Sequence, residues 1–295
     1  MGADLYQEFG FVRELFDMAA EIARMDMANL CFKGPMSELT LTVNLQPAVT
    51  VVNLACLAIL EKEELFPDFS AGHSLGEFSA LTAAGIISRP DALRLVFERG
   101  KLMHREAGRH RGAMQAIIGL KIDAVTELVR QIAGPGVVSV ANHNAETQIV
   151  ITGGPEPVNA VGALAKERGA KAIALKVSGA WHSELIRGAE DEFRTYLGTI
   201  EFHSPKNRVI HNVTADSAEN PDEIRALMAR QLCSPVRWYD TMVKLMDEGV
   251  EVFAELGPGK VLSGLLKKTL PPDYPADIYN LYDLKSIETF FDAIA

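Results

Sequence analysis

Gly72-His73-Ser74-Leu75-Gly76 is the stretch that decides the fold of this 295-residue chain. It matches Gly-x-Ser-x-Gly, the pattern of a sharp strand-to-helix turn that exposes a serine hydroxyl. Residues 65–71 before it predict a strand, and residues 77–85 after it predict a helix that ends on a glycine. The flanking glycines suit an elbow whose backbones approach too closely for side chains. The segment therefore predicts an α/β fold with Ser74 as a nucleophile; the alternative is a plain strand–helix turn.

Composition and charge place the chain among ordinary soluble globular proteins. Hydrophobic residues make up 48% of it and charged residues 23%, enough to bury a full core. The formal net charge is −10, which argues against nucleic acid as a partner. The three cysteines, Cys31, Cys56 and Cys233, are isolated and odd in number. This usage is typical of a reducing compartment, so we expect a cytoplasmic protein without disulfides.

Targeting signals, membrane spans and metal sites have no counterpart in the sequence. The first four residues lack the basic start and apolar run of a signal peptide. The most apolar stretch, residues 48–60, is shorter than a bilayer requires and carries Asn53. We expect a buried helix there, with Pro47 in its first turn. No Cys-x-x-Cys or His-Glu-x-x-His spacing occurs, so we expect no bound metal.

Residues 113–178 differ in pattern from the sequence around them. Strands and helices are predicted there in the order βαββαβ, the signature of a ferredoxin-like unit. The predicted strands cover 113–120, 137–142, 148–152 and 172–177, and the predicted helices cover 123–132 and 157–168. The flanking sequence predicts α/β structure. We therefore expect an α/β-hydrolase-like catalytic domain of residues 1–110 and 179–295, with an inserted ferredoxin-like small domain of residues 111–178.

A serine nucleophile needs a base, and seven histidines compete for that role. His182 follows an apolar strand and the small-residue turn 178–180. This places it on a loop at a strand end, where catalytic groups collect. The alternative is a histidine that only caps a loop, and the other six histidines stay open. On triad logic, three acidic residues are candidates to orient the base: Glu184, Asp191 and Asp240.

Residues 72–81 read Gly-His-Ser-Leu-Gly-Glu-Phe-Ser-Ala-Leu, which resembles the active-site segment of the malonyl-CoA:acyl-carrier-protein transacylases. Further pieces match in the family's order over nearly the whole chain, at 45–48, 98–100, 141–144, 177–183, 204–205, 212–214, 231–238 and 255–262. No single piece is specific, but the ordered set is very specific.

The resemblance implies a Ser–His dyad in which Ser74 is the nucleophile and His182 the base, without an essential acid. A backbone carbonyl near Gln231 then holds the imidazole, and the backbone amide of Leu75 donates to the oxyanion. Arg99 would grip the free carboxylate of the malonyl group with two parallel hydrogen bonds. The alternative for Arg99 is an ordinary surface arginine near a helix end.

Three further residues enter through the same resemblance. Asn142 and Asn144 match a pair near the family's cofactor channel; equally, they could cap a strand end. Trp181 stands where the family has phenylalanine. Both side chains are aromatic, but the larger indole would narrow the acyl pocket and favour malonyl over methylmalonyl.

The first residues depart from the family pattern. The family begins with a strand and a Gly-Gln-Gly-Ser-Gln motif, whose second glutamine supplies a backbone amide to the oxyanion hole. Residues 1–6 align with what normally follows that motif. The expectation is a start codon assigned too late; the alternative is a crippled or non-catalytic protein.

The resemblance implies transfer of a malonyl group from malonyl-CoA to the pantetheine thiol of acyl carrier protein, in support of fatty acid or polyketide synthesis. Malonyl-CoA is a substrate, and no cofactor is expected. We expect a monomer with acyl carrier protein as its partner and no membrane association. One rival function is an acyl-thioester hydrolase acting on carrier proteins, which would not need Arg99. The other is a truncated, non-catalytic carrier-protein binder.

Overall fold

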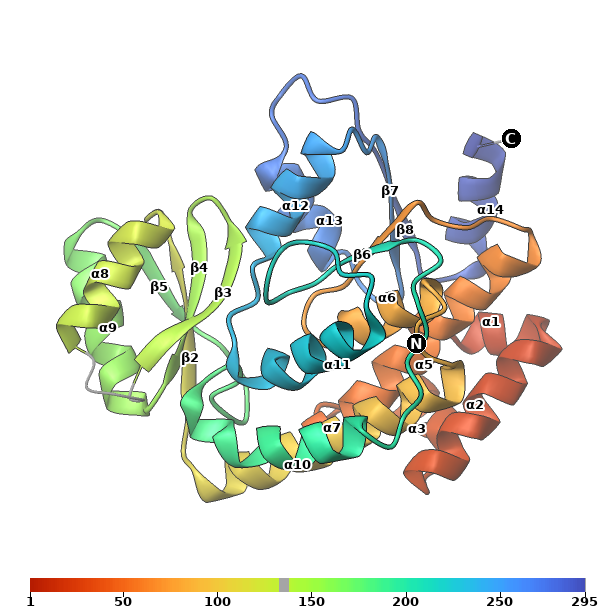
Figure 1. Cartoon of the computed structure of the whole chain (residues 1–295), viewed down its shortest axis with the longest axis horizontal. Coiled ribbons are helices and arrows are strands. Elements are labelled where there is room, and N and C mark those ends of the chain that lie inside the picture. Colours follow the sequence, from red (N-terminus) through yellow and green to blue (C-terminus); the bar gives the residue numbers. More distant parts are fainter. Residues whose placement is uncertain (133–137, 295) are drawn as a thin grey trace. The chain divides into compact units, whose positions relative to one another are not determined.

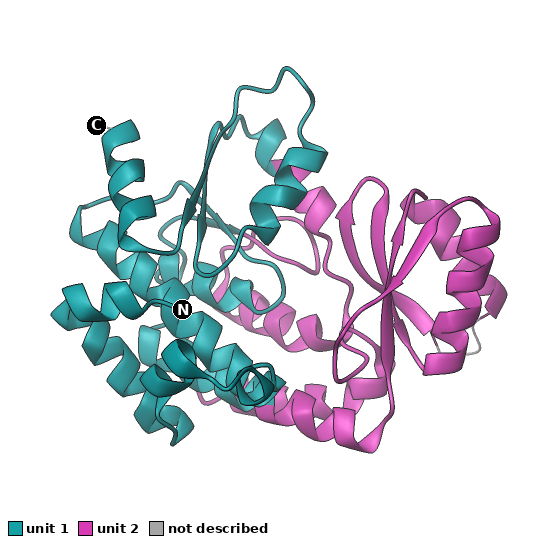
Figure 2. Cartoon of the chain, turned by 180° about the vertical axis from the view of Figure 1, so that it is seen from behind, with its two compact units in different colours: residues 1–100, 202–209, 245–295 teal, residues 101–201, 210–244 magenta. Residues whose placement is uncertain are grey.

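The structure is a computed structural model that describes residues 1–132 and 138–294. The chain forms two compact units, coloured separately in Figure 2. Unit 1 comprises residues 1–100, 202–209 and 245 onward, and unit 2 comprises residues 101–201 and 210–244. The domain boundaries at 110/111 and 178/179 stay a prediction.

Unit 1 begins with consecutive helices and continues through the serine elbow (Figure 1). Its first elements are α1 (Ala3–Glu8), α2 (Gly10–Ala23), α3 (Met27–Lys33), α4 (Met36–Leu39), α5 (Thr42–Lys62), β1 (Phe69–Ala71), α6 (Gly76–Ala83) and the first part of α7 (Arg89–Arg109). Its later elements are β6 (Arg208–Ile210, whose last residue falls in unit 2), β7 (Val252–Leu256), α13 (Val261–Thr269), β8 (Asp277–Leu281) and α14 (Leu284–Ile294).

Helix α5 is the central helix of unit 1, and Pro47 is not in its first turn. The helix begins at Thr42, so the proline is its sixth residue and the prediction was wrong in this detail. Among the described residues, α5 alone has the length and apolar composition to cross a membrane. Because 78% of its most apolar 18-residue window is buried inside the protein, it packs as a core helix does.

The strands of unit 1 are short. β1 pairs with β6, and β7 pairs in parallel with β8 from Val252 opposite Asp277 to Leu256 opposite Leu281. The strand predicted over 65–71 covers only Phe69–Ala71. The preceding residues end α5 through a left-handed Glu64, and Pro67 has no N–H to give to a ladder. Parallel strands joined through helices confirm the α/β class.

Unit 2 contains the predicted βαββαβ run. Its elements are β2 (Ala113–Ile118), α8 (Ile122–Ile132), β3 (Val138–Ala145), β4 (Gln148–Gly153), α9 (Pro155–Glu167) and β5 (Lys171–Ala174). The strands lie in the order β3-β4-β2-β5, and every neighbouring pair is antiparallel. This is the ferredoxin-like arrangement, so the prediction is confirmed for this unit of the fold.

The two faces of this sheet follow from alternation along its strands. Ile117, Ile149 and Ile151 face one side, where they form a buried core with the apolar residues of α8 and α9. Met114 and Val150 face the other side and pack near Trp181. One face is therefore covered by helices, while the other meets the segment that carries His182.

The remainder of unit 2 is mostly helical. Its elements are the last part of α7, the 3₁₀ turn η1 (Glu184–Ile186), α10 (Arg187–Leu197), α11 (Pro221–Arg230), the 3₁₀ turn η2 (Gln231–Cys233) and the first part of α12 (Trp238–Asp247). Helix α11 has a regular start, because Asn220 accepts hydrogen bonds from the amides of Asp222 and Glu223 and Pro221 occupies the first turn. Its end leads directly into η2, which contains Gln231.

Candidate active site

Ser74 lies at a strained elbow between β1 and α6. Its φ is 51°, in the left-handed region that non-glycine residues seldom occupy. The turn is closed by hydrogen bonds from the amide of Gly76 to the His73 carbonyl, at 2.9 Å, and from the amide of Glu77 to the Ser74 carbonyl, at 3.2 Å. Strain of this kind collects at functional sites, where the surrounding fold enforces it. The observed strand, turn and helix agree with the elbow predicted from the motif.

The two glycines of the motif have different reasons to be there. A Cβ on Gly72 would lie 2.0 Å from the carbonyl carbon of Gly76, so only glycine fits. A Cβ on Gly76 would meet nothing within 4 Å. The expectation that close backbones exclude side chains is therefore confirmed for Gly72 and wrong for Gly76.

This difference gives a matched pair of variants. Gly72→Ala should destabilise the protein by about 3 kcal/mol or more, because a side chain cannot be fitted against fixed backbone. Gly76→Ala should change the unfolding free energy by less than about 1 kcal/mol, since alanine suits a helix start and meets no atom there. Chemical denaturation of both variants measures this, and equal losses would contradict the account of the elbow.

Arg99 is buried beside the nucleophile. Only 2% of the residue is exposed, and its Nη2 donates a hydrogen bond to Ser74 Oγ at 3.0 Å. Its Nη1 donates to Gln46 Oε1, also at 3.0 Å. Burial lowers the pKa of Arg99 to about 10, and the nearby Glu77 carboxylate partly opposes this. The guanidinium is therefore charged at neutral pH and largely removed from water, and the surface-arginine alternative is wrong.

Gly100 explains how Arg99 comes so close to α5. A Cβ at this position would lie 3.0 Å from the Thr42 carbonyl oxygen and 3.0 Å from Val43 Cα. Its absence lets α7 approach the start of α5, and Gln46 lies on the next turn of that helix. The Arg-Gly pair thus places the guanidinium between a glutamine oxygen and the serine hydroxyl.

Gln46 is the residue of unit 1 that sequence reasoning missed. It is 4% exposed in a mostly apolar helix, and its Nε2 donates to Thr42 Oγ1 at 3.0 Å. Buried polar side chains are kept only with partners. A glutamine near the start of a helix that becomes apolar was the available signal, because its burial calls for a polar partner.

Leu75 begins α6 with helical backbone angles, φ −54° and ψ −40°. Within the described residues its amide makes no hydrogen bond to another group of the chain. The first N–H groups of a helix have no partner within the helix, and they suit developing negative charge. This geometry is compatible with the oxyanion role expected for the Leu75 amide.

In unit 2, His182 is buried and held through one ring nitrogen. It is 4% exposed, and its Nδ1 lies 2.9 Å from the Gln231 carbonyl oxygen and 3.1 Å from that of Ser234. Carbonyl oxygens only accept, so Nδ1 must carry the proton. In the neutral ring Nε2 is then the acceptor, which is the form that a general base requires.

The three acidic candidates have other partners or surroundings. The Glu184 carboxylate is paired with Arg187, and that of Asp240 accepts from Arg237 Nε at 2.7 Å. Asp191 is exposed. The carbonyl of Gln231 that the family resemblance implies is present, and the second carbonyl, from Ser234, was not anticipated. Every residue has a backbone carbonyl, so the sequence does not show which one accepts a hydrogen bond from a side chain.

The turn that carries these carbonyls is tied to the small sheet. Val236 donates to the Ala141 carbonyl at 2.8 Å and accepts from the amide of His143 at 2.9 Å. The edge strand β3 thereby extends pairing to the segment after Ser234. Asn142 and Asn144 lie on this strand and are buried, at 6% and 9% exposure.

Trp181 is half-buried against the open face of the small sheet, with Met114, Ala116, Ala141 and Val150. A Cβ on Gly179 would lie 2.7 Å from the indole ring. The glycine in the turn 178–180 therefore leaves the space that the indole occupies. Trp181 therefore packs the segment that carries His182 against the sheet.

Unit 1 thus brings together Ser74, Leu75, Arg99 and Gln46, while unit 2 brings together His182 and the carbonyls of Gln231 and Ser234. No group of three or more side chains in the described part of the chain could hold a metal ion. Unit 1 offers a serine hydroxyl beside a buried guanidinium. Unit 2 offers an imidazole that is fixed through Nδ1.

Comparison with known proteins identifies the family. Residues 1–281 match the acyl transferase domain family. The malonyl CoA-acyl carrier protein transacylase of Bacillus subtilis is 42% identical over 270 residues, which cover 91% of this chain and 85% of that protein. The crystal structure of an acyl carrier protein S-malonyltransferase from Vibrio cholerae has a TM-score of 0.93 and 37% identity, covering 100% of this chain and 95% of the other.

A third relative was solved with a partner. It is a malonyl-transacylase in complex with a type II PKS acyl-carrier protein, with a TM-score of 0.94 and 35% identity, covering 99% of this chain and 94% of the other. At 35% to 42% sequence identity, all three proteins are similar enough to this chain to share its family as well as its fold. The chain belongs to the acyl transferase domain family, among the malonyl CoA-acyl carrier protein transacylases.

Proposed function

We propose that the protein transfers the malonyl group of malonyl-CoA to the pantetheine thiol of acyl carrier protein through an ester on Ser74. Ser74 Oγ attacks the thioester carbonyl while its proton passes to His182 Nε2. The tetrahedral intermediate collapses, the C–S bond breaks, and CoA leaves with that proton. The carrier's thiol then attacks the ester, His182 accepts its proton, and the proton returns to Ser74 Oγ as the ester C–O bond breaks.

The observation that carries this proposal is the hydrogen bond between buried Arg99 and the nucleophile, 3.0 Å from Nη2 to Oγ. A guanidinium beside the attacked carbonyl can bind the free carboxylate of the acyl group with two parallel hydrogen bonds. Malonyl has that carboxylate and acetyl does not. Charge-assisted bonds of this kind are worth about 1.5–3 kcal/mol, or about ten- to a hundredfold in selectivity.

The remaining residues have supporting roles in the proposal. The Leu75 amide donates to the oxyanion, and the Gln231 carbonyl keeps His182 in the required tautomer. Asn142 and Asn144 line the approach of the pantetheine arm, and Trp181 narrows the acyl pocket toward unbranched malonyl. The protein acts as a cytoplasmic monomer without a cofactor, and it supplies fatty acid or polyketide synthesis.

A transfer assay separates this function from its rivals. The protein is mixed with malonyl-CoA labelled in the malonyl group, with and without acyl carrier protein bearing its pantetheine arm. Label should move to the carrier much faster than free malonate appears. Rapid release of malonate would favour the thioester hydrolase, which has no use for Arg99. Carrier binding without label on either protein would favour the non-catalytic binder.

A further inference from the structure

His182 lies in a strained loop of unit 2. Its φ is 58°, in the left-handed region that non-glycine residues seldom occupy. Such a conformation persists only where the surrounding structure enforces it. The carbonyls of Gln231 and Ser234 fix the imidazole ring, but they do not set the backbone of the loop. The enforcing contacts therefore have to come from the residues on either side of His182.

The residues before His182 pack against the end of α7. A Cβ on Gly112, which follows that helix, would lie 2.4 Å from the amide nitrogen of Ala180. A Cβ on Gly179 would lie 2.9 Å from the Cβ of Ala107. The loop is thus held closely at its first end, where two glycines permit the approach.

The turn directly after the histidine is shaped by Ser183, which is 3% exposed. Its Oγ donates to the Ala180 carbonyl at 2.9 Å and accepts from the amide of Leu185 at 3.2 Å. Ser183 thereby caps η1, which leads without a break into α10. Because only this short turn separates them, a displacement of the start of α10 is passed on to the backbone of His182.

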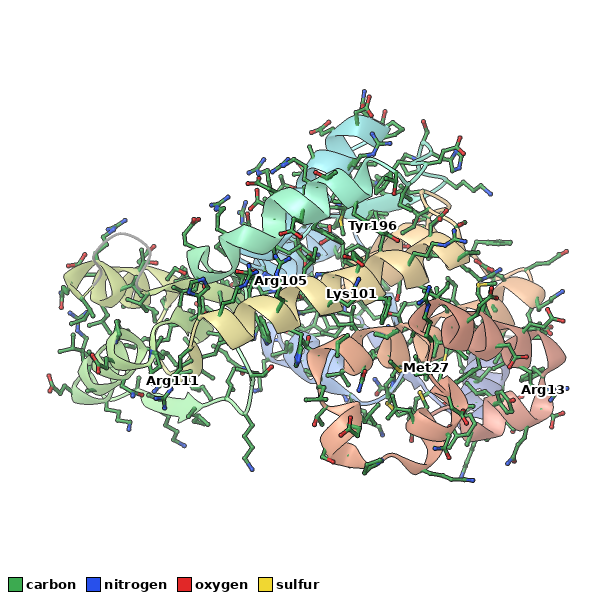
Figure 3. All side chains as sticks on the ribbon, turned by 90° about the horizontal axis from the view of Figure 1, so that it is seen from below. Arg13, Met27, Lys101, Arg105, Arg111 and Tyr196 are labelled. Atoms are coloured by element: carbon green, nitrogen blue, oxygen red, sulfur yellow. The ribbon has the colours of Figure 1, made fainter. Side chains whose placement is uncertain are left out.

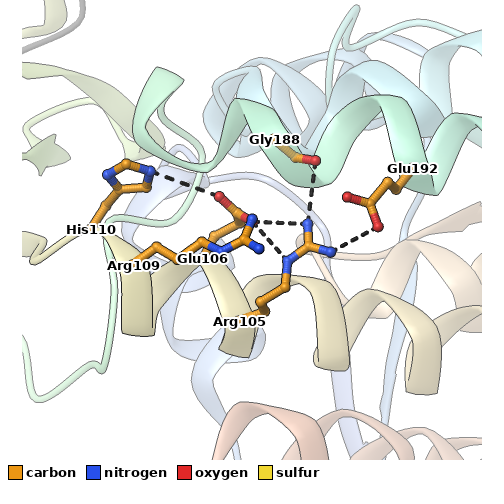
Figure 4. A network of polar contacts seen from close by, with 6 residues as sticks. All are labelled: Arg105, Glu106, Arg109, His110, Gly188 and Glu192. Atoms are coloured by element: carbon orange, nitrogen blue, oxygen red, sulfur yellow. Dashed lines mark hydrogen bonds and ion pairs between the residues drawn. The ribbon is translucent and has the colours of Figure 1, made fainter.

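The start of α10 rests on a buried carboxylate of α7, that of Glu106 (Figure 4). Glu106 is 2% exposed, and its Oε1 accepts from Arg105 Nε at 2.9 Å and from Arg109 Nη1 at 3.1 Å. A Cβ on Gly188, in the first turn of α10, would lie 3.0 Å from Glu106 Oε2. The first turn of a helix favours a negative charge, so the carboxylate and the helix start stabilise each other.

A second link between the two helices lies at the surface. Arg105, labelled with Lys101 on α7 in Figure 3, donates to Glu192 Oε2 at 2.7 Å and to the Gly188 carbonyl at 3.4 Å. The side chain of Glu192 is 56% exposed. Exposed ion pairs contribute little to stability. We therefore expect the buried Glu106, and not Glu192, to fix the start of α10.

We propose that Glu106 is a positioning residue for His182: by holding the start of α10 against α7, its carboxylate keeps the histidine loop in its strained form. This rests on the proposed function, in which His182 is the base. If the start of α10 moves, His182 loses its alignment with the carbonyls of Gln231 and Ser234. Those carbonyls select the tautomer with the proton on Nδ1, so a smaller fraction of the rings would then have Nε2 free to accept a proton.

Two variants that act on this contact from opposite sides test the proposal. Glu106→Gln keeps the length of the side chain but removes the charge that Arg105 and Arg109 face. Gly188→Ala adds a methyl group against Oε2 and leaves every charge in place. Alanine is the better helix former, so a fall in activity would not come from a weaker helix. Glu192→Gln is the matched control, because it removes the exposed link between the same two helices.

The readouts are kcat and KM for malonyl transfer, the melting temperature, and the NMR chemical shifts of the His182 ring nitrogens, assigned by comparison with a His182→Gln variant. The wild-type shifts should report a proton on Nδ1. In Glu106→Gln and Gly188→Ala we expect a mixture of both tautomers. We expect kcat to fall about tenfold and about threefold, respectively, with KM for malonyl-CoA unchanged, because a misaligned base slows the chemical step and not binding. The control should keep the wild-type shifts and rates.

Unchanged His182 shifts in both variants overturn the proposal, even if both proteins melt earlier, because a residue that only stabilises the fold would act that way. Should Glu106→Gln fail to fold, Gly188→Ala decides the matter by the same shifts. Failure of the proposed function is a different result, since the wild-type protein would then form no malonyl ester on Ser74, whichever tautomer His182 adopts.

Discussion

Ser74→Ala is expected to abolish the covalent malonyl adduct and to lower malonyl transfer by about 10⁴- to 10⁶-fold, the cost of deleting a serine nucleophile elsewhere. Oγ is the only atom of residue 74 that can form the ester. The elbow backbone does not need the hydroxyl, because its turn is closed by amide–carbonyl bonds at residues 73–77. Intact-mass measurement after mixing with malonyl-CoA detects the adduct, and a steady-state transfer assay measures the rate.

Ser79→Ala is a suitable control for this experiment. Ser79 lies on the helix that follows the elbow, and its Oγ is 3.3 Å from the Asn53 amide group. It should keep the malonyl adduct and lose at most a few-fold in rate. An adduct of undiminished amount in Ser74→Ala would show that another residue is acylated, and it would remove the basis of the proposed mechanism.

The parts of the fold that sequence predicted well are those governed by local rules. The elbow follows from the first glycine of the motif, because a tight turn leaves no room there for a side chain. A Cβ on Gly72 would lie 2.0 Å from Gly76, so only glycine fits there. The βαββαβ run follows from alternation, with Ile117 and Met114 on opposite faces of one strand. Such signals need only a few neighbouring residues.

What sequence could not provide depends on residues far apart in the chain. Arg99 lies 53 residues from Gln46, and their hydrogen bond exists because Gly100 lets two helices approach. His182 lies 52 residues from Ser234, whose contribution is a backbone carbonyl. Family resemblance named His182 and Arg99. Gln46 signalled only that it needed a polar partner, not which one, and the second carbonyl has no residue-type signature at all.

Pro47 shows the limit of a rule based on one residue. Proline favours the first turn of a helix, yet α5 starts five residues earlier. The apolar face of α5 is buried along its length, and that burial outweighs the loss of one helix hydrogen bond. Tertiary packing therefore set the helix boundary in place of the local preference.

Arg99→Ala should lower kcat/KM for malonyl-CoA by about ten- to a hundredfold, or more where the lost contact is fully buried, while acetyl transfer is kept or gained. Of the two acyl groups, only malonyl carries a free carboxylate for the guanidinium to bind. Measuring kcat/KM for both thioesters on the same preparation separates selectivity from general damage. Arg94→Ala is the control, since Arg94 lies on the same helix with a side chain that is 51% exposed and paired with Asp91.

Arg99→Lys sharpens the test, because lysine keeps the charge but cannot make two parallel hydrogen bonds to one carboxylate. Its malonyl selectivity should lie between that of the wild type and that of Arg99→Ala. Each Arg99 variant also loses or changes the hydrogen bond to Gln46, and the melting temperature measures the resulting loss of stability. That loss should affect transfer of both acyl groups equally. If Arg99→Ala lowers malonyl and acetyl transfer by the same factor, Arg99 supports the elbow through Ser74 and does not select the substrate. A ratio that shifts toward acetyl in the order wild type, Arg99→Lys, Arg99→Ala can arise only from recognition of the free carboxylate.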